Sequence, residues 1–84
     1  MSARKKVQVV YTKTCKYCGP TKEMWRDLQK VYEFEYEEID AQSSKGQELV
    51  QKFSIMTVPT TIIDGKVQFV GMPNKNKAEQ IFEE

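Results

Sequence analysis

The sequence predicts an α/β protein whose elements follow the order strand, helix, strand, helix, hairpin, helix. Three observations predict it: β-rich runs at 7–11 and 34–40, helical spacing of apolar residues between them, and two later β-rich runs separated by Asp64-Gly65. The first three elements form a βαβ unit, whose two strands we expect to be parallel with a right-handed crossover. We expect residues 1–84 to form one domain.

The first half of the chain predicts two strands and the longest helix. The run Val7 to Tyr11 is rich in β-branched residues and leads into the polar loop Thr12-Lys13-Thr14, as a strand does. Between this loop and Tyr32, apolar residues recur on one helical face, namely Met24, Trp25, Leu28, Val31 and Tyr32. Residues 34–40 alternate and then slip at Glu38, which indicates a strand with one exposed face and an irregular end.

A second helix is predicted after this strand. The segment Ser44-Lys45-Gly46-Gln47 fits a capping box, and a short apolar stripe follows at Leu49, Val50 and Phe53. Gly46 should weaken this helix slightly, because glycine has a low helix propensity.

The last third predicts a hairpin and a closing helix. Thr60 to Asp64 and Lys66 to Val70 flank Asp64-Gly65, a pair suited to a type I′ turn because both turn positions need positive φ. Asn74 is placed to cap a final helix whose Ala78, Ile81 and Phe82 face inward.

Composition excludes several classes of function. The 84 residues include 39% hydrophobic and 30% charged residues, as in ordinary soluble globules, and the net charge of +1 gives no pull toward nucleic acid or membrane. The triplet Arg4-Lys5-Lys6 precedes an apolar run that is too short for a signal peptide or a membrane span. We therefore expect an intracellular, cytoplasmic protein with neither a nucleic-acid nor a membrane partner.

The chain's two cysteines, Cys15 and Cys18, both lie in the stretch TCKYCGP. In a reducing compartment, such a close pair favours a catalytic or metal-binding role over a buried reduced pair. Because the chain has no histidine and no third cysteine, one chain cannot supply four ligands to zinc, which favours redox chemistry without a metal or cofactor. A metal or cluster shared between two chains remains an alternative, as does an adaptor whose cysteines are incidental.

Redox chemistry at this pair needs a stabilised thiolate. Lowering a cysteine pKa from roughly 8.5 to about 7 requires roughly 2 kcal/mol, whereas a helix N-terminus supplies about 0.3–1 kcal/mol, or about 2 when partly buried. We expect Lys13 and Lys16 to add positive charge, and Cys18 to donate a hydrogen bond to the Cys15 sulfur. Cys15 is then the nucleophile, and Cys18 resolves the mixed disulfide.

The position of Pro20 is compatible with two starts of this helix. If the helix begins at Cys15, Pro20 removes one ladder hydrogen bond, and if it begins at Gly19, Pro20 takes the favoured first position. The later start moves Cys15 away from the helix dipole and leaves more of the thiolate's stabilisation to the lysines.

Taken together, these motifs resemble the thioredoxin superfamily. The features that carry the resemblance are a strand leading into Cys-x-x-Cys at the head of a helix, a later Thr57-Val58-Pro59-Thr60, a hairpin and a closing helix. The length and the strand-first start are similar to glutaredoxins and to the short, glutaredoxin-sized thioredoxins of archaea. The resemblance covers nearly the whole chain.

This resemblance implies a thioredoxin fold, with order βαβαββα and a central four-stranded mixed sheet flanked by three helices. It implies a cis Pro59 that faces the cysteines, and a backbone at Val58 that pairs with an extended substrate. We assign substrate contacts to these positions and their neighbours: Tyr17, Thr57, Val58, Pro59, Gly71 and Met72.

The function expected from the resemblance is dithiol–disulfide oxidoreductase activity in cell redox homeostasis. The partners would be client proteins that contain disulfides and an electron donor, either a reductase or glutathione, and the protein would act as a monomer. A glutathione-dependent glutaredoxin is the nearest alternative. We favour thioredoxin-like action, because Gly71-Met72-Pro73-Asn74 supplies one glycine and no acid where glutaredoxins hold glutathione.

Overall fold

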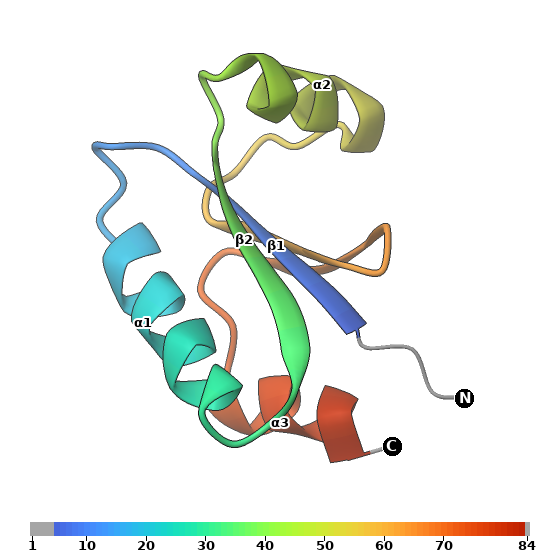
Figure 1. Cartoon of the computed structure of the whole chain (residues 1–84). Helices are drawn as coiled ribbons and strands as arrows, with labels where there is room; N and C mark the ends of the chain where they lie inside the picture. The colour runs from blue at the N-terminus through green and yellow to red at the C-terminus, as the bar shows by residue number, and fades with distance from the viewer. Residues whose placement is uncertain (1–4, 84) are drawn as a thin grey trace.

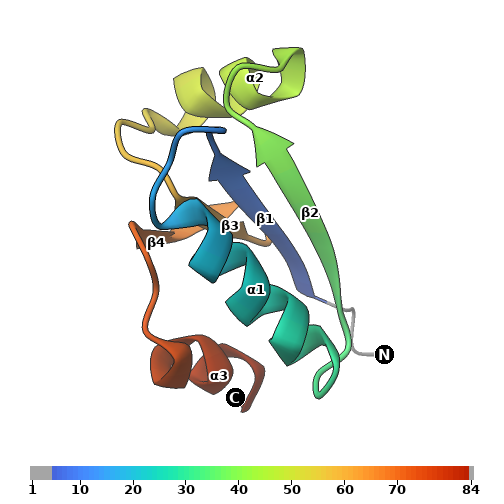
Figure 2. The same cartoon turned by 90° about the vertical axis from the view of Figure 1, so that its left-hand side faces the viewer.

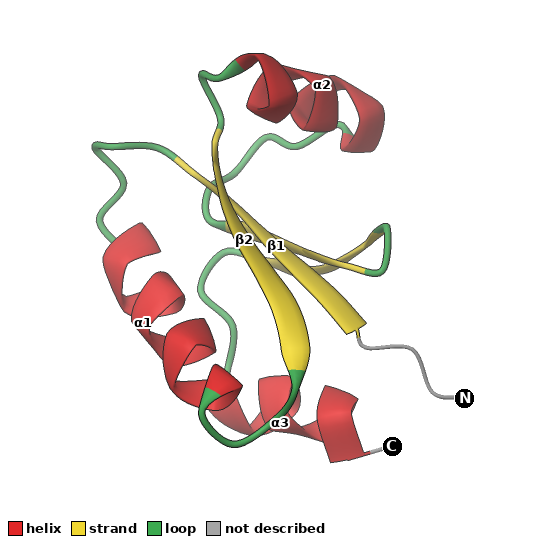
Figure 3. Cartoon of the chain, in the orientation of Figure 1, coloured by secondary structure: helices red, strands yellow, loops and turns green. Residues whose placement is uncertain are grey.

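The computed structural model describes residues 5–83, so Arg4 and the two ends of the predicted domain lie outside the described residues. The predicted element order is confirmed (Figures 1 and 3). The elements are β1 (Lys5–Tyr11), α1 (Cys18–Gln29), β2 (Phe34–Asp40), α2 (Ser44–Phe53), β3 (Thr60–Ile63), β4 (Lys66–Val70) and α3 (Lys75–Glu83).

The strands form one mixed sheet in the order β2-β1-β3-β4. As predicted for a βαβ unit, β1 and β2 are parallel, whereas β3 pairs antiparallel with both β1 and β4. The irregularity predicted at Glu38 is absent, since β2 keeps its register with β1 through Asp40. The register shift lies instead between β3 and β4, where Gln68 is the extra residue of β4.

The register brings several loops to one end of the sheet. Tyr11, the last residue of β1, pairs with Asp40, and Val10 pairs with Thr60 at the start of β3. Thr60 also pairs with Val70, the last residue of β4. The segments that carry Cys15, Pro59 and Gly71 therefore leave the sheet at the same end.

Helices α1 and α3 cover one face of the sheet, and the main core lies beneath them (Figure 2). Trp25 of α1 is fully buried there and makes ring contacts with Phe34, Phe69 and Phe82 at centroid distances of 6.1–6.2 Å. Ala78, Ile81 and Phe82 pack against this core as predicted. Val31 does not, because α1 ends at Gln29 and leaves the Val31 side chain 75% exposed.

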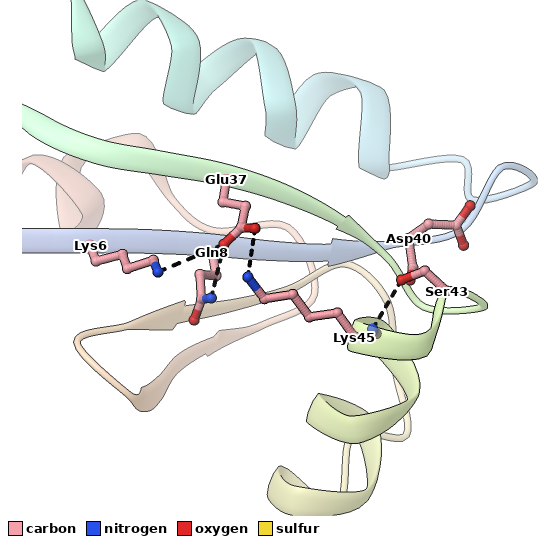
Figure 4. Close-up of polar contacts among 7 residues, drawn as sticks. Lys6, Gln8, Glu37, Asp40, Ser43 and Lys45 are labelled. Atoms are coloured by element: carbon pink, nitrogen blue, oxygen red, sulfur yellow. Dashed lines mark hydrogen bonds and ion pairs between the residues drawn. The ribbon is translucent and has the colours of Figure 1, made fainter.

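Helix α2 lies beyond the end of β2, at the top of Figure 1. A polar cluster links it to the adjacent face of the sheet (Figure 4): the Glu37 carboxylate accepts from Lys45 of α2 at 2.7 Å and from Gln8 at 3.1 Å, and Lys6 lies 3.9 Å away. These contacts, those to Lys45 and Gln8 foremost, lower the pKa of Glu37. One charged network thus anchors α2 to β1 and β2.

The start of α2 corrects two expectations. The N-cap is Ser43 rather than Ser44, and its hydroxyl accepts from the Gly46 N–H at 3.0 Å. Gly46 is also more than a weak helix former, because a Cβ there would lie 1.9 Å from the Asp40 carbonyl oxygen. This glycine lets α2 approach the end of β2 closely.

The two predicted turn and cap signals are confirmed. Asp64 and Gly65 have φ of 52° and 79°, as a type I′ turn requires, and β3 ends one residue earlier than predicted because Asp64 belongs to the turn. The Asn74 side chain accepts from the Asn76 N–H at 2.8 Å and so caps α3. Among the helices of residues 5–83, none has the length and apolar character needed to cross a membrane.

Candidate redox site

Cys15 and Cys18 form a disulfide with a Cα–Cα distance of 5.4 Å, so the structure represents the oxidised form. Their surroundings differ. Cys18 is 2% exposed and belongs to the first turn of α1, whereas Cys15 lies in the preceding loop and is partly exposed. One sulfur of the pair is therefore open to a partner and the other is enclosed.

Helix α1 begins at Cys18, between the two predicted starts. Pro20 is its third residue, where the backbone N–H would have no intrahelical acceptor, so the proline costs the helix no hydrogen bond. The Cys15 backbone precedes the first turn, yet its sulfur is bonded to the first helical residue. The sulfur of Cys15 is thus held at the helix N-terminus although its Cα is not in the helix.

Local hydrogen bonds hold the loop that carries Cys15. Its N–H donates to the Thr12 carbonyl at 3.3 Å, and the Tyr17 carbonyl accepts from both the N–H and the hydroxyl of Thr21, at 3.1 and 2.8 Å. Thr21 is fully buried and was not among the predicted site residues. The signal that would have found it is a threonine in the first helical turn, where a hydroxyl can bond the carbonyl four residues earlier.

The lysines near the two cysteines differ in their contacts. Lys13 and Lys16, the predicted sources of positive charge, are exposed, and the Lys16 ammonium lies 5.6 Å from the Tyr17 ring centroid. Lys22 is better placed for a defined interaction, because its ammonium lies 3.3 Å from the Tyr11 ring centroid. This cation–π contact joins the end of β1 to α1 across the loop that holds Cys15.

The second predicted segment lies at the same end of the sheet. The Val58–Pro59 peptide bond is cis, as the resemblance implied, and Pro59 is buried. Its carbonyl accepts from the Gly71 N–H at 2.7 Å, and the Thr60 hydroxyl donates to the Thr57 carbonyl. Across residues 5–83, the backbone of Val58 has no hydrogen-bond partner.

The remaining predicted contact residues are accessible. Tyr17 is 52% and Met72 51% exposed, and Gly71 has a φ of 82°. The structure thus joins Cys15 to Cys18 and Pro59 to Gly71, with Tyr17 and Met72 next to these pairs in the chain. Residues 5–83 contain no group of three or more His, Cys, Asp or Glu side chains arranged to hold a metal ion.

A redox-active disulfide at the head of a helix, beside a sheet end that also carries a cis proline, is the arrangement of a thiol–disulfide oxidoreductase. Residues 5–83 match the family model described as thioredoxin domain. A thioredoxin of Methanocaldococcus jannaschii is 30% identical over 74 residues, which cover 83% of this chain and 82% of that protein. The chain belongs to the thioredoxin family.

Solved structures agree with this fold. A malarial protein superposes with a TM-score of 0.80 at 21% identity, covering 96% of both chains. Thioredoxin of Fasciola hepatica gives a TM-score of 0.74 at 24% identity, covering 95% of this chain and 79% of that one. The predicted thioredoxin fold and dithiol–disulfide oxidoreductase function are therefore confirmed.

Proposed function

We propose that the chain reduces disulfides of client proteins in two exchange steps, with Cys15 as the attacking residue. The Cys15 thiolate attacks one client sulfur and forms a Cys15–client disulfide, while the other client sulfur leaves as a thiolate and takes up a proton. The Cys18 thiol then loses its proton, attacks the Cys15 sulfur and closes the Cys15–Cys18 disulfide, and the second client sulfur leaves as a thiolate and takes up a proton. Two electrons and two protons pass to the client.

The observation that carries these roles is the difference in exposure within the pair. The attacking protein sulfur must line up with the S–S bond of the client, so the client disulfide needs open space in front of that sulfur. The partly exposed Cys15 offers this space, and the 2% exposed Cys18 does not. Cys18 is instead within bonding reach of Cys15, as the disulfide itself demonstrates. The enclosed residue therefore suits the intramolecular second step.

The segment before β3 supplies the proposed contact with the client backbone. The peptide groups of Val58 have no partner within residues 5–83, so an extended client segment can pair with them as an added strand would. Thr57, Gly71, Met72 and Tyr17 flank this position and are proposed to contact the same segment. Lys13 and Lys16 are proposed to favour the thiolate at Cys15.

We further propose that the protein acts as a monomer in the cytoplasm. A reductase recharges it in preference to glutathione. The test is reduction of insulin disulfides by the wild-type protein, Cys15→Ser and Cys18→Ser, each recycled in parallel by thioredoxin reductase with NADPH or by glutathione. We expect both variants to lose turnover and the reductase to recycle the wild type faster. Equal turnover in all three proteins would refute the redox roles, and faster recycling by glutathione would refute the choice of donor.

A further inference from the structure

The Tyr11–Lys22 contact brackets the loop that carries the disulfide. Tyr11 ends β1 four residues before Cys15, and Lys22 lies in α1 four residues after Cys18. The Lys22 ammonium lies 3.3 Å from the centroid of the Tyr11 ring, and both residues are partly buried. The contact therefore joins the two ends of the loop that Figure 2 shows between β1 and α1.

The main apolar core does not reach this end of the strand and the helix. Among the residues of the core cluster, Val9 is the last one from β1 and Met24 is the first one from α1. Tyr11 and Lys22 both lie beyond these residues, on the side of the cysteines. The Tyr11–Lys22 contact thus joins β1 to α1 nearer to the redox site than the apolar core does.

This contact gains importance when the disulfide is reduced. In the oxidised form, the bond between Cys15 and Cys18 links the loop to the first residue of α1. Reduction opens that link. The hydrogen bond from the Cys15 N–H to the Thr12 carbonyl is long, at 3.3 Å, and connects the loop only to itself. The Tyr11–Lys22 contact does not involve sulfur, so it can still hold the loop against α1 in the dithiol form.

The disulfide and the Tyr11–Lys22 contact close the same segment of chain, one inside the other. When one of them is formed, the ends that the other must join are already close, so less chain entropy is lost in the second closure. Such coupling is reciprocal, because it is a difference in free energy between the same states. Its size is limited by the strength of a cation–π contact near the surface, a factor of roughly two to five in an equilibrium constant.

We propose that Lys22 is a positioning residue of the redox reaction. Through the Tyr11 ring it holds the Cys15 loop against α1, and so favours closure of the disulfide when Cys18 attacks. The proposal rests on the proposed function, in which this closure is the second exchange step. Because the ammonium is directed at the ring, Lys22 shifts the equilibrium between dithiol and disulfide and leaves the reactivity of the Cys15 thiolate unchanged.

The test measures this equilibrium in glutathione buffers. The protein disulfide and two glutathione molecules are converted into the protein dithiol and one glutathione disulfide, and mass spectrometry after acid quenching and alkylation gives the oxidised fraction. Lys22→Gln removes the cation, Tyr11→Leu removes the ring, and the double variant removes both. Lys22→Arg and Tyr11→Phe keep a cation and a ring. Lys52→Gln is the matched control, since its ammonium lies 5.3 Å from the Phe53 ring within α2 and brackets no cysteine.

We expect Lys22→Gln and Tyr11→Leu each to shift the equilibrium about threefold toward the dithiol. For a two-electron couple, this shift raises the reduction potential by about 14 mV. The double variant should shift it no further, because both substitutions remove the same contact. Lys22→Arg, Tyr11→Phe and Lys52→Gln should keep the wild-type equilibrium. The rate at which iodoacetamide alkylates Cys15 in the reduced protein should be the same in all of them.

A wild-type equilibrium in Lys22→Gln would overturn the proposal, as would a threefold shift in Lys22→Arg. Effects that add in the double variant would overturn it by showing that the two residues act separately. Slower alkylation of Cys15 in Lys22→Gln would instead assign Lys22 an effect of charge on the thiolate and overturn the positional role. Absence of insulin reduction by the wild type would refute the proposed function, whereas the threefold shift does not depend on insulin, so the two failures are distinguishable.

Discussion

The Gly71 N–H donates a 2.7 Å hydrogen bond to the carbonyl oxygen of Pro59, which joins the segment before α3 to the segment before β3. Both residues were predicted to contact substrate, and this bond joins their two segments at the end of the sheet from which the Cys15 loop also leaves. The contact depends on backbone geometry, because Gly71 has a φ of 82° that other residues adopt only with strain.

Gly71→Ala tests whether this backbone contact matters for activity. Gly65 is the matched control, since it has a φ of 79° and, like Gly71, no atom within 4 Å of an added Cβ. Each substitution should cost about 1–2 kcal/mol of unfolding free energy in urea titrations, because alanine is strained at positive φ. Only Gly71→Ala should also slow insulin reduction. If both variants slow it equally, reduced stability rather than the Gly71–Pro59 contact accounts for the loss.

Gly46→Ala should destabilise the protein although alanine is the better helix former. The helix propensity gains about 1 kcal/mol, but the new Cβ would overlap the Asp40 carbonyl, and overpacking of this kind costs about 1–3 kcal/mol. In Gly19→Ala, the matched substitution in α1, the Cβ meets no atom within 4 Å, so stability should hold or rise. Thermal and urea unfolding compare the two. A Gly46→Ala variant as stable as Gly19→Ala would show that α2 does not need its close approach to β2.

The Glu37 cluster predicts a pH-dependent contribution to stability. Contacts with Lys45, Gln8 and Lys6 lower the pKa of Glu37 in the folded protein, so its contribution is fully present above the unfolded pKa of about 4.3 and is lost as the pH falls through the lower native value. Glu37→Gln should therefore be less stable than the wild type near neutral pH, and the difference should vanish in acid.

Urea titrations over this pH range measure the effect of Glu37→Gln. Glu35→Gln serves as the control, because Glu35 is exposed two residues earlier on the same strand. A stability difference for Glu37→Gln that does not change with pH would contradict the electrostatic origin.

The contact between Lys22 and Tyr11 predicts a further effect on stability. Lys22→Gln removes an ammonium 3.3 Å from the ring centroid and should cost about 0.5–1 kcal/mol. Lys16→Gln is the comparison, since its ammonium lies 5.6 Å from the exposed ring of Tyr17 and should contribute less. Urea titration distinguishes them, and equal costs would mean that the Tyr11 contact adds nothing specific.

The order of the elements could be predicted from the sequence because the signals for each element are local. The Asp64-Gly65 turn, the Asn74 cap and the helical spacing around Trp25 each follow from a few neighbouring residues, and all are confirmed. The boundaries of α1 and α2 were less certain. Pro20 is compatible with several positions in a first turn, and Ser43 and Ser44 are equally good caps until the approach to Asp40 decides between them.

Features that depend on contacts between distant segments could not be predicted from local sequence patterns. The steric need for glycine at position 46 depends on the Asp40 carbonyl, and the cavity of about 180 Å³ between the end of α2 and the β3–β4 hairpin depends on how these two elements meet. The cysteines, by contrast, were identified from spacing and count alone, because two sulfur atoms without a third ligand leave few chemistries open. The cis Pro59 came from the family resemblance, since a lone proline is usually trans.

The central claim is that Cys15 is the attacking thiol, and the most direct measurement is its rate of alkylation. The reduced protein is treated with limiting iodoacetamide over a range of pH below neutrality, and the modified cysteine is located by mass spectrometry of peptides. We predict that Cys15 is modified well ahead of Cys18 and at a lower pH than free cysteine. Modification of Cys18 first, or a Cys15 no more reactive than free cysteine, would contradict it.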